Sequence, residues 1–155
     1  MSTPTKRHNV YLPVDLIEWM TTRAERHAEP GAVASQVVAE LSTWREHLRV
    51  ELASTIWPLG EINLIADVCN GVLVGRGVDR SITWGVTEAL DQHPGSYGAK
   101  HGADEDALRA RLERLGPTAS HALAHAVDSW WKQHLEPTAD GWAKVGVRVA
   151  PEATR

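Results

Sequence analysis

The sequence predicts a mainly α-helical protein, with a short strand and two helices in its first third and a helical body after them. Three observations support this fold class. Apolar residues recur every three or four positions over several long stretches, which indicates amphipathic helices. Alternation of polar and apolar residues is confined to two short segments near the ends of the chain. The 155 residues, 43% of them hydrophobic, are enough to form a buried core.

The first third is predicted to run strand, helix, helix. Residues 5–12 alternate between polar and apolar side chains, and Pro13 ends this strand. The first helix runs from Pro13 to the break at Glu29-Pro30-Gly31. Trp57-Pro58 stops the second helix, because the residue before a proline is pushed out of helical geometry. The apolar stripe of this second helix consists of Val37, Val38, Leu41, Trp44, Leu48, Leu52 and Ile56.

The body is predicted to contain about four helices. They cover about residues 61–69, 81–93, 104–115 and 117–135, with Asp104 as the N-cap of the third. Residues 144–149 alternate again and predict a short C-terminal strand. The chain is therefore divided into a head over residues 1–57, a helical body over 58–136 and a strand or tail over 137–155. Most of the seven tryptophans are expected to be buried anchors whose ring N–H groups find partners.

Composition excludes several classes of protein. One cysteine rules out a disulfide framework and fits a reducing compartment, so we expect a cytoplasmic protein. No stretch is long and apolar enough to predict a signal peptide or a membrane span. No acid, base and nucleophile converge in the sequence, so we expect no catalysis.

Two short motifs in the first third point to a function. They are Arg7-His8-Asn9-Val10-Tyr11-Leu12-Pro13 at the strand and Ser35-Gln36-Val37-Val38 at the start of the second helix. With the order strand, helix, helix, this part of the chain resembles the ribbon-helix-helix DNA-binding family. The resemblance implies an intertwined homodimer whose two paired strands enter the major groove of double-stranded DNA.

The resemblance also assigns roles to residues. Arg7, Asn9 and Tyr11 would face the bases from the strand, with Lys6 beside them. Ser35 and Gln36 would hold a phosphate at the start of the second helix. The dimer interface would be formed by Val10, Leu12, Leu41 and Trp44. The function predicted in this way is sequence-selective DNA binding by a homodimer or higher oligomer, as a transcriptional regulator.

Two other interpretations stay open. Residues 5–56 also fit a strand edge and two core helices of an α-rich domain. The chain also fits a protein-interaction module, antitoxin-like or a phage-encoded inhibitor, that binds a protein partner through residues 58–149. Residues 1–50 carry no net charge, whereas residues 51–155 have ten Lys+Arg against fourteen Asp+Glu. The acidic body is therefore not expected to form a second DNA surface.

The remaining candidate sites favour structural interpretations. His121, His125 and Asp128 share one helical face by spacing, and we interpret that face as a solvated polar surface. Cys69 lies on an apolar helix and is interpreted as a buried, inert thiol. The glycine-containing segment 71–77 lacks the residues of a phosphate-binding loop and is interpreted as a turn. We therefore predict no metal and no cofactor.

Overall fold

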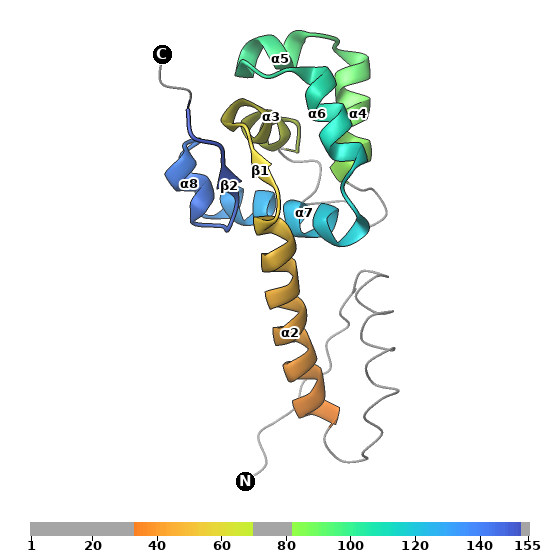
Figure 1. Ribbon diagram of the computed structural model, residues 1–155, viewed down its shortest axis with the longest axis vertical. Helices are drawn as coiled ribbons and strands as arrows, with labels where there is room; N and C mark the ends of the chain where they lie inside the picture. Colours follow the sequence, from red (N-terminus) through yellow and green to blue (C-terminus); the bar gives the residue numbers. More distant parts are fainter. Residues whose placement is uncertain (1–32, 70–81, 153–155) are drawn as a thin grey trace. The chain divides into compact units, whose positions relative to one another are not determined.

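The computed structural model describes residues 33–69 and 82–152, with side chains from Ser42 onward, and is mainly α-helical (Figure 1). The chain divides into two compact units, residues 1–41 and 42–155. The described elements are α2 (Val33–Ala53), β1 (Ile56–Trp57), α3 (Leu59–Cys69), α4 (Ile82–Gln92), α5 (Ser96–His101), α6 (Glu105–Glu113), α7 (Pro117–Lys132), α8 (Ala139–Ala143) and β2 (Arg148–Val149). Among these residues, no helix has both the length and the apolar character needed to cross a membrane.

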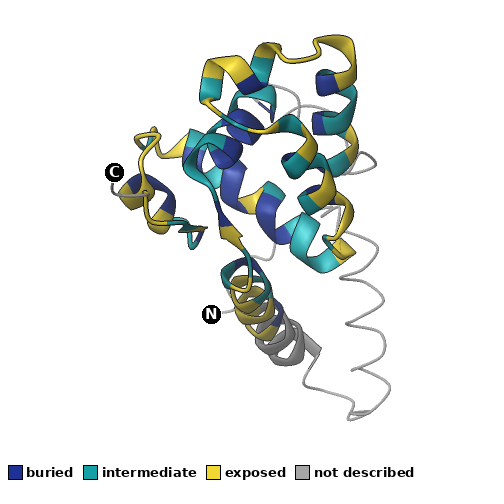
Figure 2. Cartoon of the chain, turned by 45° about the horizontal axis from the view of Figure 1, so that its top comes forward, coloured by how far each residue is buried: buried dark blue, intermediate teal, exposed yellow. Residues whose placement is uncertain are grey.

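Helix α3 is the centre of the second unit. Ile62, Leu64 and Ile65 are completely buried, and Ala66 is nearly so. The helix contacts α4, α5 and α7, so apolar side chains are needed around most of its circumference (Figure 2). The sequence predicts such a central helix over residues 61–69, and the structure confirms it with two more residues at its start.

Strands β1 and β2 pair in parallel although most of the body separates them in the chain. Ile56 lies opposite Arg148 and Trp57 opposite Val149. The backbone N–H of Ala150 donates to the carbonyl oxygen of Trp57 at 2.8 Å. The predicted C-terminal strand is therefore present, but the pairing is limited to two residues on each side.

The end of α2 differs from the sequence prediction. The helix ends at Ala53, where the Ser54 hydroxyl donates to the carbonyl oxygen of Glu51 at 2.6 Å. Ile56, predicted as the last residue of the apolar stripe, belongs to β1 instead and is 45% exposed. Pairing with β2 favours an extended backbone at Ile56, and Pro58 favours one at Trp57.

Tryptophan side chains fix α7 and α8 in the core, as the sequence predicts. The rings of Trp130 and Trp142 stack at 4.6 Å between centroids. The ring N–H of Trp142 donates to Asn63 Oδ1 at 2.8 Å, and that of Trp131 to the carbonyl oxygen of Ala66 at 2.9 Å. Both bonds end on α3, so the C-terminal elements are tied to the central helix.

Two short helices are absent from the sequence prediction. Helices α5 and α8 occupy segments between or after the predicted helices, where the sequence predicts no helix. Thr138 caps α8 by accepting from the N–H of Gly141 at 3.1 Å. The predicted cap of α6 is confirmed, since Asp104 accepts from the N–H groups of Asp106 and Ala107.

Candidate functional site

The residues predicted to read DNA lie mostly outside the described part of the chain. Lys6, Arg7, Asn9 and Tyr11 are outside it, as are Val10 and Leu12 of the predicted dimer interface. The structure describes the backbone of Ser35, Gln36 and Leu41, and all three are helical residues of α2. Trp44, also predicted at the interface, is 5% exposed.

The start of α2 bears on the predicted phosphate contact. Helix α2 is described from Val33 onward, and Ser35 and Gln36 are helical residues close to that point. N–H groups in the first turn of a helix have no partner within the helix and favour a negative charge. The phosphate contact of these two residues stays a prediction.

Several basic side chains in the described part of the second unit are paired with carboxylates. Arg111 Nε lies 2.8 Å from Glu61 Oε2, and Arg109 lies 2.8 Å from Asp91. Lys132 pairs with Asp128 one turn earlier in α7. Asp67 Oδ2 accepts from Lys100 Nζ at 2.7 Å and lies 2.8 Å from His101 Nε2. These pairs reduce the positive charge that the four bases offer to a polyanion.

The Asp67 cluster joins α3 to α5. Partial burial by itself raises the pKa of Asp67, but the hydrogen bonds from Lys100 and His101 and their charge outweigh it, so the pKa lies below the usual 3.8. The cluster is thus an ion pair on the surface of the body.

A cavity of about 290 Å³ lies among α3, α4 and α5. Glu88 and Trp84 of α4, Tyr97 of α5, and Cys69 at the end of α3 all line it. Glu88 Oε1 accepts from Gln92 at 3.2 Å, whereas its Oε2 is buried and has no hydrogen-bond partner. Burial raises the pKa of the Cys69 thiol to about 12, so this cysteine is not a nucleophile at neutral pH.

No family model, curated protein or solved structure matches this chain. The functional interpretation therefore depends on the residues themselves.

Two histidines of α7 form a second polar feature. The rings of His121 and His125 meet edge to face, with 4.8 Å between centroids, and their Nε2 atoms are 3.2 Å apart. Within residues 33–69 and 82–152, no group of three or more His, Cys, Asp or Glu is arranged to hold a metal. The spacing of the two histidines is visible in the sequence, but the convergence of their nitrogens is not.

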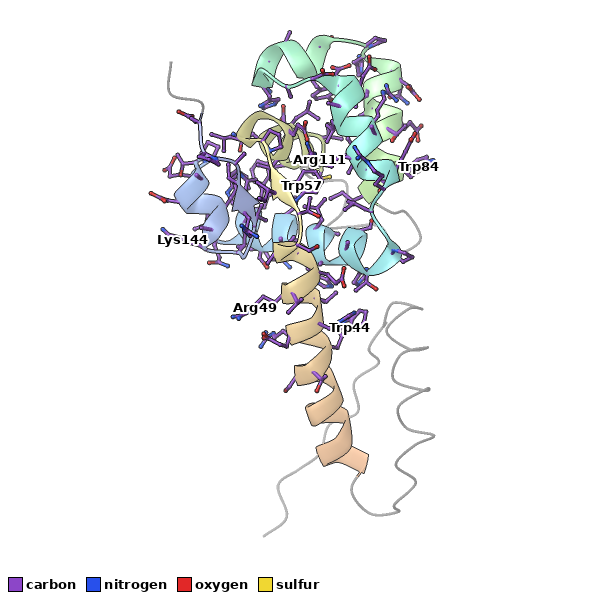
Figure 3. The ribbon with its side chains drawn as sticks, in the orientation of Figure 1. Trp44, Arg49, Trp57, Trp84, Arg111 and Lys144 are labelled. Carbon is purple, nitrogen blue, oxygen red and sulfur yellow. The ribbon has the colours of Figure 1, made fainter. Side chains whose placement is uncertain are left out.

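Sequence reasoning also missed the interaction between Glu61 and Arg111. Glu61 is 4% exposed in α3, and the guanidinium of Arg111 lies 5.7 Å from the centroid of the Trp57 ring (Figure 3). The two charged residues are fifty positions apart, so no local pattern links them. The available signal was Glu61 itself, an acidic residue in a mostly apolar central helix, where a buried charge needs a partner.

Proposed function

We propose that this chain is a sequence-selective DNA-binding protein that acts as a homodimer and regulates transcription. Arg7, Asn9 and Tyr11 of two paired strands read bases in the major groove, and Lys6 contacts the phosphate backbone. One observation carries the proposal: the residues that resemble the ribbon-helix-helix motif precede a helix, α2, that contains Ser35 and Gln36.

The charge of the body supports the assignment of DNA contacts to the head. Residues 51–155 have an excess of four acidic residues. The bases Lys100, Arg109, Arg111 and Lys132 are each within ion-pair distance of a carboxylate. Binding to a phosphate backbone needs positive charge, and the two bases Lys6 and Arg7 are adjacent in the sequence of the head.

The test begins with a search for a binding site. The full chain is incubated with fragmented genomic DNA, and the retained fragments are sequenced. An enriched site is then made as a labelled duplex, and its affinity is measured by fluorescence anisotropy at several salt concentrations. The matched variants are Arg7→Ala and Arg114→Ala, the second of which removes an exposed arginine of the body whose Nε donates to its own helix.

Arg7→Ala is expected to weaken binding by about 1–3 kcal/mol and to relax the base preference. Arg114→Ala is expected to leave both unchanged. The logarithm of the affinity is expected to fall with the logarithm of salt at about −0.9 per phosphate contacted. An affinity that responds neither to salt nor to Arg7→Ala contradicts the proposal.

A second candidate is binding of a protein partner through the body, and the exposure of Trp84 favours it. This tryptophan is 44% exposed and lines the cavity beside α4 (Figure 3). Tryptophan is enriched at protein interfaces. If this candidate is right, Trp84→Ala abolishes co-purification of a partner, whereas Val50→Ala, which truncates another exposed apolar side chain, does not. Equal recovery with both variants contradicts it.

A further inference from the structure

Helix α7 places two imidazole rings together on its surface, away from its buried residues. His121 and His125 are one turn apart, and His125 is exposed. Ala122, Leu123, Ala126 and Val127 turn toward the core, and the two histidines lie outside this buried set. Their Nε2 atoms are 3.2 Å apart.

This distance fits two ligands of one metal ion. Two nitrogens that each lie about 2.0–2.1 Å from a tetrahedral Zn²⁺ are about 3.3–3.4 Å apart. The observed 3.2 Å agrees within the tolerance of about 0.2 Å expected for a metal site. Neutral imidazole is a preferred ligand of zinc, nickel and copper ions.

We propose that His121 and His125 form a binding site for a divalent transition-metal ion of the zinc, nickel and copper class. The two Nε2 atoms are the protein ligands, and water fills the remaining positions. Asp128 lies on the same face, but its carboxylate is paired with Lys132 and is not counted as a ligand. The proposal concerns the body alone and is independent of DNA binding.

Bound metal has a structural consequence. The ion links residues in adjacent turns, so it binds the helical form of α7 and not an extended chain. A ligand that binds the folded state preferentially stabilises that state. Metal binding is therefore expected to stabilise the unit that contains α7.

The competing explanation for the short distance is a hydrogen bond between the rings. One neutral imidazole donates through N–H and the other accepts through its lone pair, which also gives a separation near 3.2 Å. In the metal site both Nε2 atoms offer a lone pair to the ion and both protons lie on Nδ1. The two explanations differ in their response to added metal.

The test uses the full chain without a polyhistidine tag and Zn²⁺ alone as the probe. Zinc binding is measured by isothermal titration calorimetry, and the melting temperature is measured with and without zinc. The variants are His125→Gln and His121→Gln, with His134→Asn as the matched control. His134 is exposed and has a φ of 52°, a conformation that asparagine tolerates well.

The wild-type chain and His134→Asn are expected to bind zinc equally. Each variant of the pair is expected to lower the affinity by about tenfold or more, because a single imidazole loses the advantage of two linked ligands. Zinc at about 100 times its dissociation constant is expected to raise the melting temperature of the wild type by about 5 °C or more, and that of His125→Gln by much less. Equal zinc affinity in the wild type and His125→Gln overturns the proposal. Because His125 is exposed, His125→Gln is expected to fold, so it tests the proposal even if His121→Gln does not fold.

Discussion

Glu61 in α3 has 4% of its surface exposed, and Arg111 of α6 is the base that meets its charge. Burying a carboxylate is costly, and the cost is offset when a partner with good geometry is present. Arg111 Nε supplies this partner at 2.8 Å, while its guanidinium packs over the Trp57 ring of β1. One arginine thus connects the central helix, α6 and the two-stranded sheet.

Removal of Arg111 is expected to destabilise the body strongly. Arg111→Ala leaves Glu61 buried without its partner and is expected to lower the free energy of unfolding by about 3 kcal/mol or more. Urea denaturation measures this change. Adding Glu61→Gln to the variant is expected to recover part of the loss, because a neutral amide is less costly to bury. Arg114→Ala should change stability by no more than about 0.5 kcal/mol, and an equal loss in both arginine variants would contradict this account.

Cys69 is the one cysteine of the chain and reports on the integrity of the core around it. Burial raises its pKa to about 12 from the usual 9.0. At pH 8 the thiolate population is then about 1000-fold lower than in the unfolded chain. We expect an aromatic disulfide reagent to react at least that much more slowly with the native protein than with the urea-unfolded protein. Similar rates in the two states would show that the thiol is accessible.

Long stretches of apolar periodicity predicted helices correctly, whereas the two short helices were not predicted. Helices α3, α4, α6 and α7 are confirmed close to their predicted bounds, because each covers at least two turns of a consistent apolar face. Helices α5 and α8 have six and five residues, respectively, and contain glycine. Such short helices have little intrinsic stability and form because packing against α3 and β2 holds them.

The glycines of α8 and α4 are expected to respond in opposite ways to alanine. A Cβ at Gly141 would lie 2.0 Å from the carbonyl oxygen of Glu136, whereas a Cβ at Gly85 has no atom within 4 Å. Gly141→Ala must push α8 from its neighbouring turn and is expected to cost about 1–3 kcal/mol. Gly85→Ala is expected to stabilise the helix by about 0.5–1 kcal/mol. Thermal unfolding of both variants checks the sign, and stabilisation by Gly141→Ala would show that the packing of α8 is wrong.

The tie between α3 and α5 is expected to weaken in acid. The pKa of Asp67 is lower in the folded state than in the unfolded chain, so its contribution to stability is present above about pH 4 and is lost as the pH falls through the folded-state pKa. The stability difference between the wild type and Asp67→Asn, measured in urea at several pH values from 6 to 3, should shrink toward low pH. Its size is expected to be modest because Lys100 is 63% exposed. Glu113→Gln, which replaces an exposed carboxylate, is the control, and a difference that grows in acid would contradict the sign.

At the scale of the whole molecule, the sequence predicted the fold class and the helical body, while the contacts between distant residues required the structure. The partners of Glu61 and Asp67 lie fifty and more than thirty positions away, on elements that only folding brings together. The predicted DNA-reading residues lie outside the described part of the chain, so their roles stay predictions. His121 and His125 show both cases. Their spacing of four residues can be read from the sequence, whereas the distance between their nitrogens depends on side-chain conformation and required the structure.

The measurement that tests the central claim most directly is the mass of the protein–DNA complex. Sedimentation of the full chain with an enriched duplex gives the number of chains on each DNA molecule. Two chains per duplex are expected, because a single strand cannot form the ribbon that enters the major groove. A protein that remains a single chain, or that sediments apart from every enriched duplex, contradicts the account.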